Sequence, residues 1–243
     1  MRRRFFVEGF ENDRAVMRGE TAEHLGRVLR AEAGQLYELS DGTSVWLARV
    51  ESVATPKRGE SRIEFSLVEA IAARAPRFTL HLLISLVKFD RFEWCLEKAT
   101  ELGAAEITPL AAARSDGQLV DAAAKRVARW ERILTESAQQ ARRLRPPKLL
   151  SAARPAEAFA ESRAACKILL SERAGAPLLR DVLRPGPDFA SVALAIGPEG
   201  GWTDEEIVAA RGAGFAEASL GENILRTETA VIAAASVIAF AVG

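Results

Sequence analysis

From Arg77 onward the sequence alternates short apolar strand patterns with helix patterns, and this alternation restricts the possible folds more than any other feature. The run 78–87 (FTLHLLISLV) is mainly apolar, as in strands buried on both faces of a parallel sheet. Asp90 is expected to cap a helix whose apolar residues recur at helical spacing from Phe92 to Leu102, and Gly103 ends it. Strands that alternate with helices predict an α/β domain with a mainly parallel sheet.

The rest of this region continues the alternation. A long helix is expected at 121–142, and further strands at 107–110, 149–150, 167–171 and 192–196.

The first 70 or so residues predict β-structure instead. Alternating apolar residues and turn signals give strands at 5–7, 35–40, 45–50 and 63–68. One short helix is expected at 21–30, with Thr21 as its cap and Leu25, Val28 and Leu29 on one face. The stretch 70–76 has no amphipathic period and ends in proline. We therefore expect a small barrel-like module at 1–72 and an α/β domain at 73–243.

Composition excludes several classes of protein. The 243 residues hold 33 Lys plus Arg and 33 Asp plus Glu, a balance that argues against a protein that coats nucleic acid non-specifically. Two Cys and two His are too few for a disulfide framework or for most zinc centres, so we expect no metal and a reduced, cytoplasmic protein. The apolar C-terminal run 229–243 is shorter than the roughly 20 residues of a membrane span. It predicts a buried helix, in the core or at a subunit interface, and no membrane partner.

Two glycine-bearing loops are the strongest candidates for a ligand site. In 195–206 (AIGPEGGWTDEE) a strand ends, a glycine-rich turn follows, and a capping box at 203–206 begins a helix. In 219–230 (SLGENILRTETA) a strand end meets Gly221, and an apolar helix begins near Thr227. Such loops bring backbone groups close to a ligand, and ligands of open α/β sheets lie at the carboxyl ends of the strands. The same turns also occur for structural reasons alone, and the absence of GK[ST] or GxGxxG makes a phosphate cradle a poor explanation.

The two loops together resemble the paired C-terminal signature of RsmE-type 16S rRNA (uracil-N3)-methyltransferases in the SPOUT superfamily. Other matching segments follow in the same order: RRRFFV, HLGRVLR at 24–30, KFDRFEWCLEKATELG at 88–103, ITPL at 107–110, Arg114-Ser115 and the region 139–146. One departure is Glu222-Asn223, where the family pattern has a sequence like Pro-Arg.

The resemblance implies a fold and a cofactor. The C-terminal domain would be a parallel-sheet SPOUT domain tied in a trefoil knot, the N-terminal domain a PUA-like β-barrel that holds RNA, and the chain a homodimer. The cofactor would be S-adenosylmethionine (SAM). The resemblance places its contacts at Leu170, Ser171 and Glu172; at Ile196, Gly197, Pro198, Glu199, Gly200 and Gly201; and at Leu220, Gly221, Asn223, Ile224, Leu225, Arg226 and Thr229.

The implied substrate is a uridine in the decoding region of 16S rRNA, in the small ribosomal subunit. Uracil N3 must lose its proton, meet the methyl group in line, and leave negative charge on O2 and O4 that fixed donors stabilise. Glu228 is a candidate base with Arg226 as anion stabiliser, unless the two form a structural pair that caps the helix. Glu199 is an alternative base, and Arg114 either holds the uracil or a phosphate or is a solvated loop arginine.

Basic and polar residues along the chain suggest where RNA would bind. The candidates are Arg2, Arg3, Arg4, His24, Arg27, Arg30, Arg114, Gln139, Gln140, Arg142, Arg143 and Arg145. Three other functions remain open: a SPOUT ribose 2′-O-methyltransferase, a non-catalytic RNA-binding module for ribosome assembly, and an α/β enzyme that acts on a nucleotide or small molecule.

Overall fold

The computed structural model describes residues 3–73, 76–183 and 189–242. Its contacts divide the chain into two compact units. The first comprises Met1–Ala75 and Ala138–Pro146, and the second Pro76–Ser137 and Pro147–Gly243. The sequence predicted domains at 1–72 and 73–243. The first unit differs from the predicted one because it also contains the segment Ala138–Pro146.

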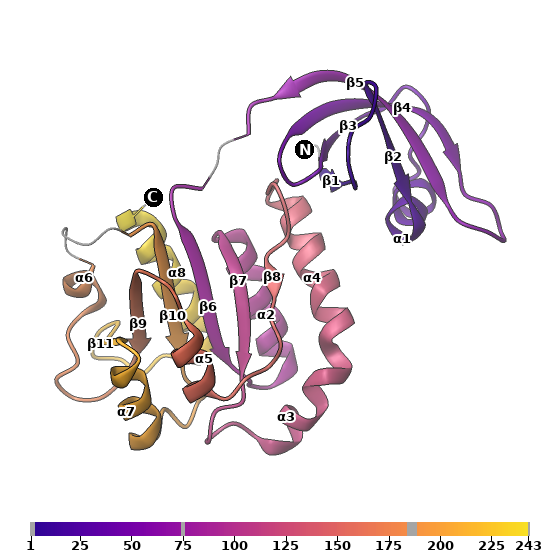
Figure 1. The fold of residues 1–243 in the computed structure, drawn as a ribbon. Coiled ribbons are helices and arrows are strands. Elements are labelled where there is room, and N and C mark those ends of the chain that lie inside the picture. Colours follow the sequence, from indigo (N-terminus) through magenta and orange to yellow (C-terminus); the bar gives the residue numbers. More distant parts are fainter. Residues whose placement is uncertain (1–2, 74–75, 184–188, 243) are drawn as a thin grey trace. The chain divides into compact units, whose positions relative to one another are not determined.

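The first unit is built on a curled five-stranded sheet in the order β1-β3-β4-β5-β2 (Figure 1). β1 runs parallel to β3, and the other pairs are antiparallel. Its strands are β1 (Arg4–Phe6), β2 (Arg14–Arg18), β3 (Leu36–Ser40), β4 (Val45–Ala54) and β5 (Arg62–Ile71). The four predicted strands are confirmed, whereas β2 was not predicted although Ala15 and Met17 alternate as buried residues.

The helix of this unit differs from the prediction. α1 (Gly19–Glu23) passes directly into a π-helix (His24–Val28), and its N-cap is Arg18, so Thr21 does not cap it. Leu25 is buried, but Val28 is 64% exposed and Leu29 38%, so the predicted face is wrong at these two positions. The wider π turn changes the angular spacing of the residues after His24. The α-helical period of 3.6 residues on which the prediction rests therefore does not hold there.

The segment Ala138–Pro146 is held in the first unit by hydrogen bonds and an ion pair. Ser40 Oγ donates to Leu144 O over 2.7 Å, and Arg4 Nη1 donates to Arg142 O over 2.5 Å. The Arg142 guanidinium lies 3.6 Å from Glu38 Oε1, and Arg4 Nη2 lies 3.1 Å from Glu38 Oε2. Glu38 is 7% exposed, so a buried carboxylate between two arginines joins distant parts of the sequence.

The second unit contains, within the described residues, a six-stranded sheet in the order β11-β9-β10-β6-β7-β8, all of whose pairs are parallel. The strands are β6 (Thr79–Ser85), β7 (Ala104–Leu110), β8 (Lys148–Leu149), β9 (Cys166–Leu170), β10 (Ser191–Ile196) and β11 (Ala216–Ala218). The helices are α2 (Phe89–Glu101), α3 (Gly117–Ala123), α4 (Val127–Gln140), α5 (Pro155–Glu161), α6 (Leu179–Val182), α7 (Asp204–Gly212) and α8 (Thr227–Val242). The predicted parallel α/β fold is confirmed.

Helices cover both faces of this sheet, which explains why the central strands β6 and β10 are mainly apolar (Figure 1). Leu82 and Ile84 of β6 lie in a core with side chains of α2, α4 and α8, whereas Leu83 lies in a second core with side chains of α5 and α7. α2 begins at Phe89, with Lys88 rather than Asp90 as N-cap.

The predicted helix 121–142 is broken. A 3₁₀ turn (Ala124–Arg126) separates α3 from α4. No Gly or Pro lies at the break, so the sequence carries no local signal for it. In the part of the chain that the structure describes, no helix is both long and apolar enough to span a membrane.

Candidate functional site

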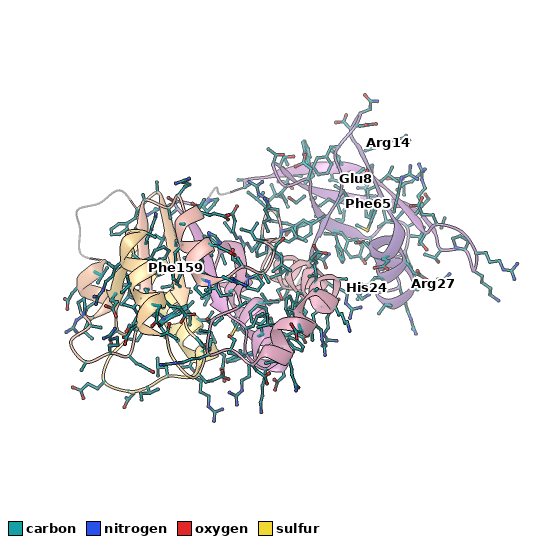
Figure 2. All side chains as sticks on the ribbon, turned by 60° about the horizontal axis from the view of Figure 1, so that its bottom comes forward. Glu8, Arg14, His24, Arg27, Phe65 and Phe159 are labelled. Carbon is teal, nitrogen blue, oxygen red and sulfur yellow. The ribbon has the colours of Figure 1, made fainter. Side chains whose placement is uncertain are left out.

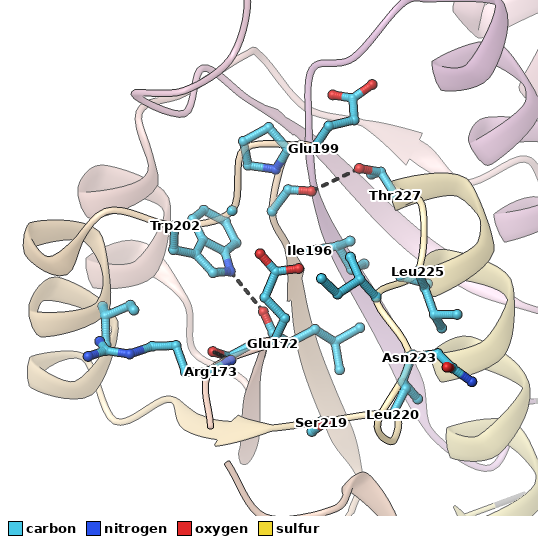
Figure 3. A pocket seen from close by; sticks show the side chains of 18 of the residues that line it. Glu172, Arg173, Ile196, Glu199, Trp202, Ser219, Leu220, Asn223, Leu225 and Thr227 are labelled. Atoms are coloured by element: carbon cyan, nitrogen blue, oxygen red, sulfur yellow. Dashed lines mark hydrogen bonds between the residues drawn. The ribbon is translucent and has the colours of Figure 1, made fainter. Parts of the chain in front are cut away.

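A cavity of about 350 Å³ lies at the carboxyl ends of three adjacent strands of the second unit. Its walls come mainly from the segments 170–173, 196–202 and 219–225, which follow β9, β10 and β11 (Figure 3). Because β9 lies between β10 and β11, the two glycine-bearing loops face each other across the end of β9. This is the edge at which open parallel sheets bind their ligands.

The first loop is a tight turn fixed at both ends. Gly201 N donates to Pro198 O over 2.9 Å, and Gly201 has a φ of +68°, which side chains rarely adopt. Thr227 Oγ1 donates to Gly197 O over 3.1 Å and so joins the loop to the start of α8 (Figure 3). The loop is therefore held in place by the protein itself.

Trp202 forms one wall of the cavity. Its indole is buried and donates through Nε1 to Leu170 O over 2.8 Å (Figure 3). A Cβ on Gly197 would lie 3.1 Å from Trp202 Cε2, so Gly197 leaves room for the indole. Trp202 thereby links the loop after β10 to the end of β9.

The second loop carries few interactions of its own among the described residues. Ser219 Oγ donates to Gly221 O over 3.0 Å, and Ser219 N donates to Pro177 O over 2.7 Å. Gly221 has a φ of +134°, and a Cβ there would meet no atom within 4 Å. Its backbone conformation, and not lack of space, explains the glycine.

A buried carboxylate connects a third loop to the cavity. Glu206, in the predicted capping box, accepts from Thr203 N over 2.9 Å and from Ala113 N over 2.8 Å. Next to Ala113, Arg114 lines the cavity and donates through Nη1 to Gly200 O over 2.7 Å. Arg114 is thus part of the site and not only a solvated loop arginine.

Two predicted bases share one arginine. Glu199 Oε1 lies 3.3 Å from Arg91 Nη1, and Glu228 Oε1 lies 3.8 Å from Arg91 Nε. Glu228 is 9% exposed, and its Oε2 has no hydrogen-bond partner in the described ranges. Burial, together with the negative charges of Glu228 and Glu199, raises the pKa of the nearby Cys95 thiol to about 12, so this thiol stays protonated.

Most predicted cofactor contacts line the cavity. They are Leu170, Ser171, Glu172, Ile196, Gly197, Pro198, Glu199, Gly201, Leu220, Gly221, Asn223, Ile224 and Leu225. Gly200, Arg226 and Thr229 do not line it. Lining residues outside the predicted cofactor contacts are Arg114, predicted for catalysis and RNA, and Arg173, Trp202, Asp204, Ile207, Ser219, Glu222, Thr227 and Ala230. Trp202 and Glu222 lie within the two motifs. Arg91 lies in the matching segment 88–103, but no role was predicted for it.

The possible Arg226–Glu228 pair is not formed. Glu228 pairs with Arg91, while Arg226 is exposed on the loop before α8. Glu228 is buried, and its ion pair within the described residues is the 3.8 Å contact between Oε1 and Arg91 Nε.

The predicted RNA contacts, apart from Arg114, belong to the first unit. Arg3, His24, Arg27, Arg30, Gln140, Arg142 and Arg145 are exposed, and Arg143 is half-buried. Figure 2 labels His24 and Arg27 on the first unit. Burial lowers the pKa of Arg143 to about 10, and Arg145 adds to the effect. Arg4 and Gln139 are buried, and Arg4 is committed to Glu38, so these two do not present their side chains to solvent. Arg2 lies outside the described residues.

No group of three or more His, Cys, Asp or Glu side chains suited to a metal ion occurs within 3–73, 76–183 and 189–242.

The chain is similar to RNA methyltransferases. A family model described as an RNA methyltransferase domain matches residues 74–239. Among curated relatives, the ribosomal RNA small subunit methyltransferase E of Synechocystis is 35% identical, over 85% of this chain and 66% of its own length. The protein of the same name from Bacillus subtilis is 28% identical, over 91% of this chain and 88% of its own length.

Solved structures agree along nearly the whole chain. A Legionella pneumophila protein in complex with the bound cofactor SAM matches with a TM-score of 0.86 and 31% identity, covering 99% of this chain and 98% of that one. A ribosomal RNA small subunit methyltransferase E from Neisseria gonorrhoeae, bound to SAM, matches with a TM-score of 0.82 and 28% identity, covering 98% and 97%.

Proposed function

The chain belongs to the RNA methyltransferase domain family, and from this premise we propose that it transfers the methyl group of SAM to N3 of a uridine in 16S rRNA of the small ribosomal subunit. One observation carries the proposal: two glycine-bearing loops and the end of β9 surround a single cavity at the carboxyl edge of the sheet. The SAM-bound relatives share the fold of this chain over 98% or more of its length.

The residues of the cavity suit SAM. Its volume of about 350 Å³ lies within the usual range of small-molecule sites, roughly 300–1,000 Å³. Apolar side chains (Leu170, Ile196, Leu220, Leu225) provide surface for an adenine, and carboxylates and backbone groups provide polar contacts. Bound SAM supplies an electrophilic methyl group, so the protein need only position the uridine and manage its proton.

Arg114 is the proposed donor toward the negative charge that develops on uracil O2 and O4. It lines the cavity, and its bond to Gly200 O leaves the rest of a five-donor guanidinium available. Arg226, the other proposed donor, is exposed and would have to turn toward the substrate.

Glu199 is the better placed of the two proposed bases. It lines the cavity, although its carboxylate points away from the cavity in Figure 3 and lies near Arg91. Glu228 is buried outside the lining residues and is better suited to hold Arg91 in position. Glu199→Gln should therefore lower kcat more than Glu228→Gln.

The exposed basic residues of the first unit are proposed to bind the RNA. We include in this proposal the finer features implied by the family resemblance, a PUA-like barrel in the first unit and a trefoil knot in the second.

A cytoplasmic homodimer completes the proposal. α2 packs against α8, and these helices expose Trp94 (43%) and Phe240 (93%) respectively. Exposed aromatic side chains on packed helices suit a subunit interface. Light scattering should give the mass of two chains for the native protein and of one chain for the variant Phe240→Glu.

Methyl transfer to small-subunit RNA tests the proposed function. Purified protein, labelled SAM and either naked 16S rRNA or subunits that lack the modification should yield 3-methyluridine, identified by mass spectrometry of nucleosides. A 2′-O-methylated nucleoside would instead indicate the ribose methyltransferase. No transfer to any of these RNAs, with SAM bound, would favour the non-catalytic module.

A further inference from the structure

Carboxylates outnumber cationic side chains in the cavity lining. Its acids are Glu172, Glu199, Asp204 and Glu222, and its cations are Arg114 and Arg173. Glu199 lies 3.3 Å from Arg91, and Asp204 lies 3.2 Å from Arg173. Glu172 and Glu222 have no ion-pair or hydrogen-bond partner for their carboxylates among the described residues.

Of these two, Glu172 is the one that the fold directs into the cavity. It follows β9 by two residues, and the bond from Trp202 Nε1 to Leu170 O fixes the end of that strand. In the view of Figure 3 its carboxylate projects between Trp202 and Ile196. Glu222 lies on the loop after Gly221, and both residues are exposed.

The loop after β10 makes room for this carboxylate. A Cβ on Gly201 would lie 2.9 Å from Glu172 Oε1, so a larger residue there would force this carboxylate to shift. Arg114 Nη1 would lie 3.9 Å from the same Cβ. Arg114 donates to Gly200 O, and no ion pair forms between it and Glu172 among the described residues.

We propose that Glu172 distinguishes the methyl donor from its demethylated product by charge. This rests on the proposed function. SAM carries a sulfonium cation, whereas S-adenosylhomocysteine has a neutral thioether at the same place and is otherwise the same molecule apart from the methyl group. An unpaired carboxylate within the cavity attracts the sulfonium and gains nothing from the thioether. Glu172 thereby favours binding of the donor and release of the product.

Three ligands of similar shape, two cationic and one neutral at the sulfonium position, show whether Glu172 acts on charge. SAM, S-adenosylhomocysteine and sinefungin, which has an ammonium group where SAM has its sulfonium, are titrated by calorimetry into native protein and the isosteric variant Glu172→Gln. The variant should bind SAM and sinefungin about tenfold more weakly and S-adenosylhomocysteine within about twofold of native, because the carboxylate acts only on the cation. Glu131→Gln, which removes an exposed charge on α4 outside the cavity lining, is the control and should leave all three affinities unchanged.

Two results would overturn the assignment: equal weakening of all three ligands, which would mean that Glu172 contacts a part they share, or no weakening of SAM. A salt series on native protein gives a second test that does not depend on the variant. The preference for SAM over S-adenosylhomocysteine should fall between 50 mM and 500 mM NaCl as ions screen the charge, and a constant ratio would contradict it. If native protein binds none of the three compounds, the proposed function itself fails, and this inference with it.

Discussion

Gly197 and Gly221 are required for different physical reasons. A Cβ on Gly197 would press on the buried indole of Trp202, whereas Gly221 has open space around it but a φ of +134°. From the sequence, both were predicted to be glycines beside a ligand. The structure indicates instead that Gly197 acts through Trp202, which forms the wall of the cavity.

Gly197→Val should therefore weaken SAM binding at least about tenfold, because displacement of the indole breaks its bond to Leu170 O and moves a wall of the site. Calorimetry with SAM measures the effect, and circular dichroism checks that the fold is kept. Gly212→Val is the matched control, since a Cβ at Gly212 meets nothing within 4 Å. Native SAM affinity in Gly197→Val would contradict this role of Trp202.

The buried Glu38 makes Arg4 a structural residue of the first unit. Arg4→Met leaves Glu38 with only the longer contact to Arg142, at 3.6 Å, so the free energy of unfolding should fall by about 3 kcal/mol. Arg62→Met removes the more exposed pair with Glu64 and should cost less than about 1 kcal/mol. Urea titrations measure the free energy of unfolding of both variants. An equal decrease in the two would contradict a larger effect of the buried Arg4–Glu38 pair.

At the scale of elements, Glu206 joins the start of α7 to the loop that carries Arg114. Its two oxygens accept from Thr203 N and Ala113 N, and the residue is 8% exposed. One side chain therefore both caps a helix and orders a neighbouring part of the candidate site.

Glu206→Ala should lower the free energy of unfolding by about 2 kcal/mol, because it leaves two backbone N–H groups without their acceptor. Hydrogen exchange at Ala113 should also become faster. Glu205→Ala, one residue earlier and exposed, is the control and should change both quantities little. Unchanged exchange at Ala113 in Glu206→Ala would mean that the loop is held by other contacts.

Local signals explain which elements the sequence could predict. The capping box at Thr203 and Glu206, and Gly103 with its φ of +94° after α2, depend on neighbouring residues and are confirmed. The π-helix at His24–Val28 packs closely against distant residues: a Cβ on Gly26 would lie 2.6 Å from Thr55 Cγ2 and 3.1 Å from Val53 Cγ1. Such contacts between distant residues leave no periodic signal in the sequence.

In the candidate site, too, local sequence predicts some residues and misses others. Both glycine-bearing loops could be predicted, because each motif holds its own turn residues. The role of Arg91 could not be predicted, because this residue contacts Glu199 and Glu228 from a helix more than 100 residues earlier in the chain.

At the scale of the whole molecule, the first unit combines the N-terminal residues with Ala138–Pro146. This places Arg3 and Arg145 in one compact unit, and both are exposed. Arg142, by contrast, holds Glu38, so reversing its charge would disturb folding as well as any RNA contact.

Arg3→Gln combined with Arg145→Gln should therefore test RNA binding more cleanly. If each contacts a phosphate, the slope of log K against log salt should become shallower by about two, roughly one for each contact. Filter binding to 16S rRNA between 50 and 200 mM salt measures it. Lys125→Gln, an exposed charge in the second unit, is the control, and an unchanged slope in the double variant would place the RNA elsewhere.

The central claim is that the loops after β10 and β11 form one site for the methyl donor. A crystal structure of the protein grown with SAM tests it most directly. The predicted result is SAM density between 196–201 and 219–225, beside Trp202 and the end of β9. SAM bound at another place, or a well-ordered cavity without density at saturating SAM, would contradict it.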